Sequence, residues 1–87
     1  METIIIMTEV KDSLYGRYVK FTIKGDRKVI AEVDRRDGKY YIFGGCHELA
    51  TRTNKDSAIK YAQDYITGFI PDAKFKWNVM SERIKYN

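Results

Sequence analysis

The chain has one cysteine and one histidine, Cys46 and His47, and the two are neighbours in the sequence. A thiol beside an imidazole is a pairing that nucleophilic catalysis uses, because the imidazole can take the proton from the thiol. Adjacent residues on an extended chain point to opposite faces, however, and a working pair also needs a third group that orients the base. We therefore expect a half-buried Cys46 and a polar His47 at the rim of a sheet, with no catalytic residue here.

Three carboxylates are close together in the sequence: Glu32, Asp34 and Asp37. Paired carboxylates can serve as a general acid and base, or they can bind a divalent cation. The basic residues among them are typical of a solvated hairpin tip of mixed charge: Arg35, Arg36 and Lys39. We expect this segment to be such a tip, with neither of the two chemical roles.

Two further signals for a site are incomplete. Glu48 follows Cys46 and His47, but three ligands in a row lack the number and spacing of a zinc site. Gly44 and Gly45 fit neither the phosphate-binding loop nor the dinucleotide fingerprint, and they indicate a bulge or a sharp strand end. The sequence therefore predicts a protein that is not an enzyme and that holds no metal and no cofactor.

The composition bounds the class of protein. The 87 residues include 16 Lys and Arg against 12 Asp and Glu, and 44% of them are hydrophobic, which excludes a disordered or collagen-like chain. No apolar run approaches the roughly 20 residues that a membrane-spanning helix needs. A single cysteine forms no internal disulfide, whereas small secreted domains usually need several. We expect a cytoplasmic protein without a membrane contact, with one α+β domain over residues 1–80 and a polar tail over residues 81–87.

Hydrophobic alternation predicts strands over residues 3–10, 17–24, 28–34, 39–44 and 74–80. Before the last strand, a helix of about fourteen residues follows a cap at Thr53 or Asn54 and ends near Gly68 or Pro71. The pattern of residues 49–52 fits either a bulged continuation of the sheet or a loop, and the sequence does not decide between the two. The predicted fold is α+β: an antiparallel meander of four to five strands with one helix packed on one face, in the order β-β-β-β-α-β.

The helix and the sheet are expected to share one apolar layer. The helix contributes a stripe at helical spacing: Ile59, Ala62, Ile66, Phe69 and Ile70. The sheet contributes the inward positions of its second and third strands: Val19, Phe21, Ile23, Val29 and Val33. One helix covers one face, so the other face of the sheet is left open.

Lysine, arginine and aromatic side chains are interleaved in the strands of this open face. Residues 17–60 contain eleven basic and six acidic residues, whereas the remaining residues contain five and six. Rings among cations can stack bases and attract backbone phosphates. The residues that we predict to bind nucleic acid or another partner are Tyr18, Lys20, Lys24, Arg27, Lys28, Arg35, Arg36, Lys39, Tyr41 and Phe43. A second interpretation stays open, in which the rings belong to the core or to a dimer interface and the lysines keep the sheet soluble.

The first functional prediction is binding to nucleic acid, with single strands favoured. The order of four strands and a helix over about residues 17–70 resembles the unit of the Whirly and Pur-alpha families, and this resemblance implies single-stranded nucleic-acid binding. The chain also resembles phage-encoded inhibitors, including anti-CRISPR proteins, in which a small sheet carries a helix. The alternative prediction is therefore a protein-binding modulator, a phage-type inhibitor of a host complex that handles nucleic acid, with a host or phage protein as its partner.

A homodimer is also expected. The strand that runs from Thr3 to Val10 is apolar on both faces, and we expect it at an edge of the sheet, where it could pair with a second copy. The open sheet face, with its rings, is the other surface through which two copies could meet.

Overall fold

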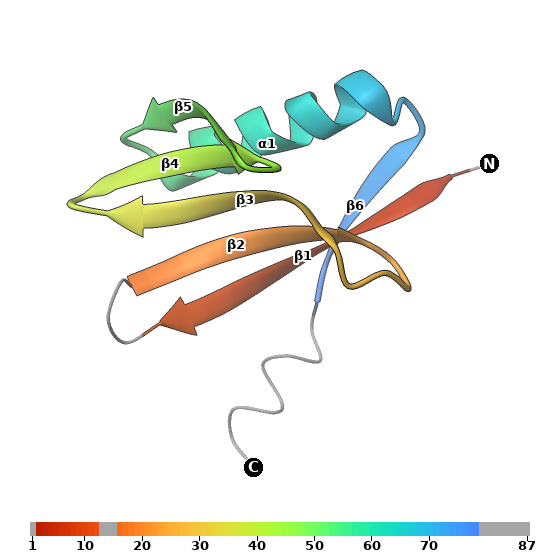
Figure 1. The fold of residues 1–87 in the computed structure, drawn as a ribbon, viewed down its shortest axis with the longest axis horizontal. Coiled ribbons are helices and arrows are strands. Elements are labelled where there is room, and N and C mark those ends of the chain that lie inside the picture. The colour runs from red at the N-terminus through yellow and green to blue at the C-terminus, as the bar shows by residue number, and fades with distance from the viewer. Residues whose placement is uncertain (1, 13–15, 79–87) are drawn as a thin grey trace, which may run out of the picture.

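The computed structural model describes residues 2–12 and 16–78, so the tail predicted for residues 81–87 lies outside the described residues. The described chain contains six strands and one helix (Figure 1). In chain order they are β1 (Thr3–Asp12), β2 (Gly16–Ile23), β3 (Val29–Arg36), β4 (Lys39–Gly44), β5 (His47–Arg52), α1 (Lys55–Phe69) and β6 (Ala73–Trp77).

The six strands form one sheet in the order β5-β4-β3-β2-β1-β6. The strands β1 to β5 pair antiparallel with one another, as short turns between consecutive strands require. The chain then passes through α1 from one edge of the sheet to the other, where β6 pairs parallel with β1. The predicted α+β class is confirmed, with one strand more than expected and with a parallel last strand.

Residues 47–52 form the additional strand, β5. Gly45 has a φ of 63°, a left-handed conformation that glycine adopts without strain, and it lies in the two-residue turn between β4 and β5. The register of this hairpin shifts between Ile42 and Phe43, so that Phe43 pairs with Glu48. The glycine pair therefore marks a hairpin turn, and the sheet continues beyond it.

The helix begins where the sequence predicts. Asn54 is the N-cap residue, and its side chain accepts a hydrogen bond from the Ser57 N–H at 3.0 Å. The residues that α1 buries are Ala58, Ile59, Ala62 and Ile66. Phe69 was expected in this stripe, but the residue is 53% exposed, and its ring packs edge-on against Tyr65 with 5.2 Å between the ring centroids.

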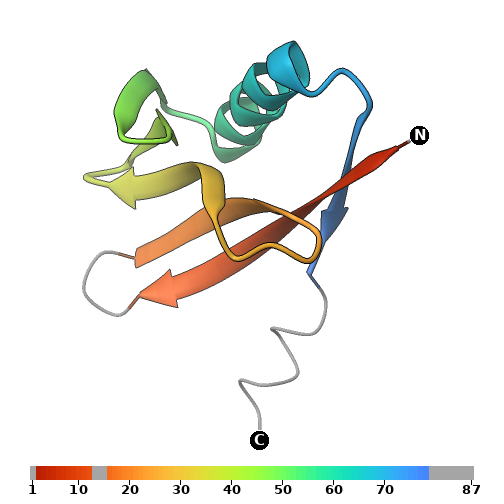
Figure 2. The same ribbon diagram turned by 45° about the vertical axis from the view of Figure 1, so that its right-hand side comes forward.

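The core lies between α1 and one face of the sheet, as Figures 1 and 2 show. Its sheet residues are each at most 4% exposed: Ile5, Met7, Val19, Phe21, Ala31, Val33 and Ile42. The expectation for Val29 is wrong, because a register shift between β2 and β3 places it opposite Thr22, and Ile30 packs against the core. No described helix or strand covers the opposite face of the sheet.

The first strand is not at an edge of the sheet, contrary to expectation. Over Thr3–Met7 it pairs with β6 on one side, while β2 occupies its other side. The pairing with β6 extends to the Asn78 N–H, which donates to the Met7 carbonyl at 2.8 Å. This part of β1 therefore has no free backbone groups for a second copy, and the edge strands of the described sheet are β5 and β6. Ile5 and Met7 are buried under α1 instead.

Candidate binding face

Alternation along each strand separates the helix-covered face from the face that no described element covers. We call the uncovered side the open face. Its residues on the four central strands are Ile4, Ile6, Thr8, Tyr18, Lys20, Thr22, Glu32, Asp34, Arg36, Tyr41 and Phe43. All of these side chains except Arg36 are half-buried, because neighbouring strands bring them into contact with one another.

Two carboxylates lie in the middle of the open face. Glu32 stands between Lys20 of β2 and Phe43 of β4 in the register of the sheet. Asp34, two residues further along β3, pairs with Tyr41 of β4. The prediction that these acids belong to a solvated hairpin tip is wrong, since only Asp37 lies in the β3–β4 turn, where it is exposed.

The environment of Glu32 favours its neutral form. Burial among the neighbouring side chains, followed by the hydrogen bond and the charge of Asp34, raises the pKa of Glu32 from 4.5 to about 7. The positive charges of Lys20 and Arg36 oppose this rise but do not cancel it. Near neutral pH, Glu32 therefore changes between a neutral acid and a carboxylate.

Asp34 is the more enclosed member of the pair. Its side chain is 18% exposed, and Oδ2 accepts an ion-paired hydrogen bond from Arg36 Nη2 at 3.2 Å. Its other oxygen, Oδ1, is buried and has no hydrogen-bond donor in the described chain when Glu32 is ionised. A protonated Glu32 provides such a donor, and its hydrogen bond with Asp34 is one cause of its raised pKa. The pair is thus a polar site whose hydrogen bonding is incomplete at high pH.

A shallow cavity of about 220 Å³ opens beside the carboxyl pair. It is lined by Glu32, Asp34, Arg36 and Phe43 and by Gly45 and Cys46 of the β4–β5 turn. Cys46 is exposed, so the expectation of a half-buried thiol is wrong: the turn carries it out of the sheet. The cavity offers a ring, two carboxyls and a thiol to a partner.

The predicted binding residues do not form one patch. Four of them have open-face positions: Lys20, Tyr41 and Phe43 lie around the carboxyl pair, and Tyr18 lies at the margin, where it also lines a cavity on the helix-covered side. Arg36 is on the same face but is paired with Asp34, and Lys39 is exposed beside the β3–β4 turn.

The other four lie elsewhere. Lys24, Arg27 and Lys28 are exposed in the β2–β3 turn, at the far end of the eight-residue strand β3 from Lys39, a separation of about 25 Å. Arg35 belongs to the helix-covered side, because it alternates with Asp34 and Arg36 and pairs with Tyr40. The basic surplus is therefore divided between two ends and two faces of the sheet.

The sequence analysis missed the two open-face acids as site residues. Glu32 and Asp34 flank Val33, which was assigned to the inward face of the third strand, so strict alternation could have found them on the open face. It also missed two cations of β6, Lys74 and Lys76, which pair with Ile4 and Ile6 of β1 in the register. Their positions depend on the parallel pairing of β6, which alternation does not reveal.

Among residues 2–12 and 16–78, no three His, Cys, Asp or Glu side chains gather closely enough to hold a metal ion. The helix of the described chain is too short and too polar to cross a membrane.

Fold and site together define the class: a small α+β protein whose helix covers one side of a mostly antiparallel sheet, with a candidate binding face on the other side. No protein-family model matches the sequence, and comparisons with curated proteins and with solved structures find no match either. The five strands before α1 also differ from the four-strand unit of the Whirly and Pur-alpha families. The open face itself is therefore the basis for a functional proposal.

Proposed function

We propose that the protein is a non-enzymatic binding protein whose open face takes a protein partner and holds a basic side chain of that partner at the carboxyl pair. The observation that supports this proposal is the position of Glu32 and Asp34 in the centre of the face, between Lys20 and the rings of Tyr41 and Phe43. This arrangement favours the protein-binding modulator over the nucleic-acid binder.

Charge is the first reason for this preference. A phosphate backbone that crosses the open face would pass over the two acids at its centre, where like charges repel. The exposed cations of the two turns stand at opposite ends of β3, about 25 Å apart: Lys24, Arg27 and Lys28 at one end and Lys39 at the other. Nucleic acid is therefore the less favoured occupant, and we treat it as an outcome of the test below.

Chemical complementarity is the second reason. A guanidinium can hydrogen-bond to both carboxyls and lie against the faces of Tyr41 and Phe43, so that one side chain uses both features of the site. Arg36 already pairs with Asp34, but its side chain is 56% exposed and reaches the enclosed carboxylate from the solvent side. A partner's arginine can replace it there. The half-buried Ile4 and Ile6 add an apolar area beside this anchor.

The experiment uses matched variants as bait in lysate of the source cells, with and without nuclease. Glu32→Gln and Asp34→Asn together remove the charge of the site with little change of shape, whereas Asp37→Asn removes an exposed acid of the neighbouring turn. We expect the wild-type bait to capture a protein that stays bound after nuclease treatment. The double variant should capture at least about tenfold less of this protein, and the Asp37 variant should capture as much as the wild type.

A direct measurement separates the two classes of partner. Fluorescence anisotropy with labelled single-stranded DNA at low salt reports nucleic-acid binding, and a tetra-arginine peptide reports recognition of basic side chains. Peptide binding that the double variant loses supports the proposal. The function is nucleic-acid binding instead if the double variant binds DNA as well as the wild type or better, and if nuclease releases the captured protein.

A further inference from the structure

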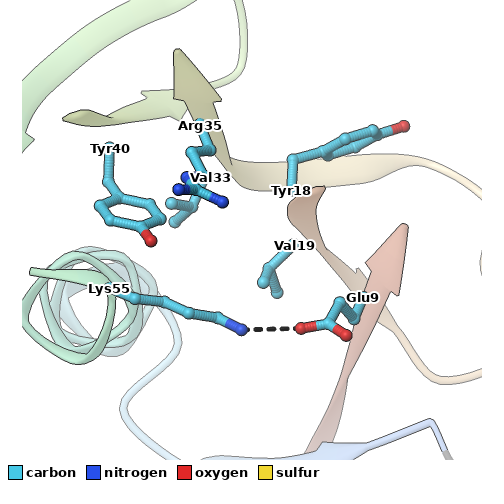
Figure 3. Close-up of a pocket in the computed structure, with 7 residues that line it drawn as sticks. All are labelled: Glu9, Tyr18, Val19, Val33, Arg35, Tyr40 and Lys55. Carbon is cyan, nitrogen blue, oxygen red and sulfur yellow. Dashed lines mark hydrogen bonds and ion pairs between the residues drawn. The ribbon is translucent and has the colours of Figure 1, made fainter. Parts of the chain in front are cut away.

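A second cavity, of about 230 Å³, lies on the helix-covered side of the sheet (Figure 3). It exists because α1 begins at Lys55, so the helix does not cover the end of the sheet where β1 and β3 finish. Val19 and Val33, which pair with each other in the register, form its floor. Tyr40 and the stem of Lys55 form its walls, and Arg35 and Glu9 bring charge to it.

The charges of this cavity are unequal. Lys55 Nζ donates to Glu9 Oε2 at 2.7 Å, so these two opposite charges are matched across the cavity. The Arg35 guanidinium, by contrast, has no hydrogen bond or ion pair with any residue that the structure describes. Lys55 is also the first residue of α1, and the N-terminal end of a helix favours negative charge. Among the described residues that line the cavity, the positive charge of Arg35 is therefore unmatched.

We infer that this cavity binds a small organic anion, a carboxylate or a phosphate carried on a flat apolar group. The apolar group lies on Val19 and Val33 against the ring of Tyr40, and the oxyanion accepts hydrogen bonds from the Arg35 guanidinium. Figure 3 shows the guanidinium and the Tyr40 hydroxyl on the same side of the space, so the hydroxyl is a second donor.

The size of the cavity limits the ligand. Pockets for drug-sized molecules have volumes of about 300–1,000 Å³, so a cavity of about 230 Å³ takes a single ring with one charged group. An apolar floor with a few polar groups around it is the usual composition of such pockets. This site is on the opposite side of the sheet from the open face, and the inference does not depend on the proposed function.

The test is an NMR titration of the ¹⁵N-labelled protein with phenyl phosphate and with benzoate. These two probes distinguish phosphate from carboxylate, and benzamide is the neutral control of the same shape. We expect saturable shifts at the amides of Val33, Arg35 and Lys55 with both anions or with one of them, and none with benzamide.

Neighbouring arginines provide the matched variants. Arg35→Gln removes the charge at the cavity and should weaken anion binding about tenfold or more. Arg36→Gln removes the next charge on the same strand, which faces the other side of the sheet, and should leave anion binding unchanged. The dispersion of each variant's spectrum checks that it is folded. The inference is wrong if no anion gives saturable shifts at these amides, if benzamide binds equally well, or if the two variants weaken binding equally.

Discussion

The Glu32 and Asp34 carboxyls stand two residues apart on the same side of β3, and the burial and hydrogen bonding that they share raise the pKa of Glu32 to about 7. Proteins usually place such acids in solvent, because burial disfavours the charged form. Here the rings of β4 and the cations Lys20 and Arg36 surround the pair. Four predictions follow from this site and from the elements that position it.

The first prediction concerns stability and pH. Glu32 has a pKa of about 7 in the folded chain and 4.5 as an ordinary side chain, so the folded state binds more protons between these values. Its contribution to the free energy of unfolding is therefore present at low pH and is lost as the pH rises through 7. Glu32→Gln should be more stable than the wild type at pH 8, by about 1 kcal/mol after allowance for solvent screening.

Urea unfolding of the two proteins from pH 4 to pH 9 measures this difference. Glu48→Gln is the control, because Glu48 is an exposed acid at the far end of the same cross-strand row. Equal pH dependence of the wild type and Glu32→Gln would contradict the assignment of the raised pKa to Glu32.

The second prediction concerns the start of α1. Asn54→Ala removes the side-chain oxygen that accepts from the Ser57 N–H, and it should lower the free energy of unfolding by about 1 kcal/mol. Thr53→Ala changes the adjacent residue, which is exposed and is not the cap, and should have an effect below about 0.5 kcal/mol. Chemical denaturation measures both. A larger loss for Thr53→Ala than for Asn54→Ala would mean that the helix begins one residue earlier.

The third prediction distinguishes two residues of the helix stripe, Ile66 and Phe69. Ile66 is fully buried, so Ile66→Ala should lower the free energy of unfolding by about 2–5 kcal/mol. Phe69 is 53% exposed and contacts Tyr65 at the surface, so Phe69→Ala should cost about 1 kcal/mol or less. Thermal and urea unfolding compare the two variants. Similar losses would place Phe69 in the core after all.

The fourth prediction uses Cys46 as a probe of the open face. The thiol is exposed and lines the cavity beside the carboxyl pair, so a thiol reagent should label it in the folded protein with full stoichiometry. A bulky maleimide at this position should weaken capture of the protein partner at least about tenfold, whereas Cys46→Ser should capture it normally. Mass spectrometry measures the labelling, and the nuclease-treated pull-down measures the binding. Unchanged capture by the labelled protein would place the partner away from this cavity.

The local part of the fold was predictable from the sequence. Alternation identified four of the strands before the helix, and the cap at Asn54 and the stripe of Ile59, Ala62 and Ile66 agree with the structure. These features depend on the preferences of a few neighbouring residues, which sequence patterns carry directly. The strand β5 was left open, because its pairing depends on a bulge and a glycine turn.

The candidate site was only partly predictable. Tyr41 and Phe43 were assigned to the open face, but Glu32 and Asp34 were interpreted as part of a charged turn. A count of charges along residues 17–60 treats all cations as one group, whereas the strands send Arg35 and Arg36 to opposite faces. The cavity around Arg35 exists because α1 starts at a residue that leaves the ends of β1 and β3 uncovered. No local sequence pattern specifies this placement of the helix on the sheet.

The sequence by itself determined the α+β class, the surplus of positive charge and the residues that can form the core, because composition and periodicity decide which surfaces must be buried. The tertiary structure alone decided on which face of the sheet each charged side chain lies and which residues surround it. The crossover through α1 brings β6 beside β1 and removes β1 from the edge, and the register of β2, β3 and β4 encloses two acids among rings. Burial and electrostatic neighbours depend on residues far apart in the chain, so the centre of the open face is acidic although the chain carries a net charge of +4.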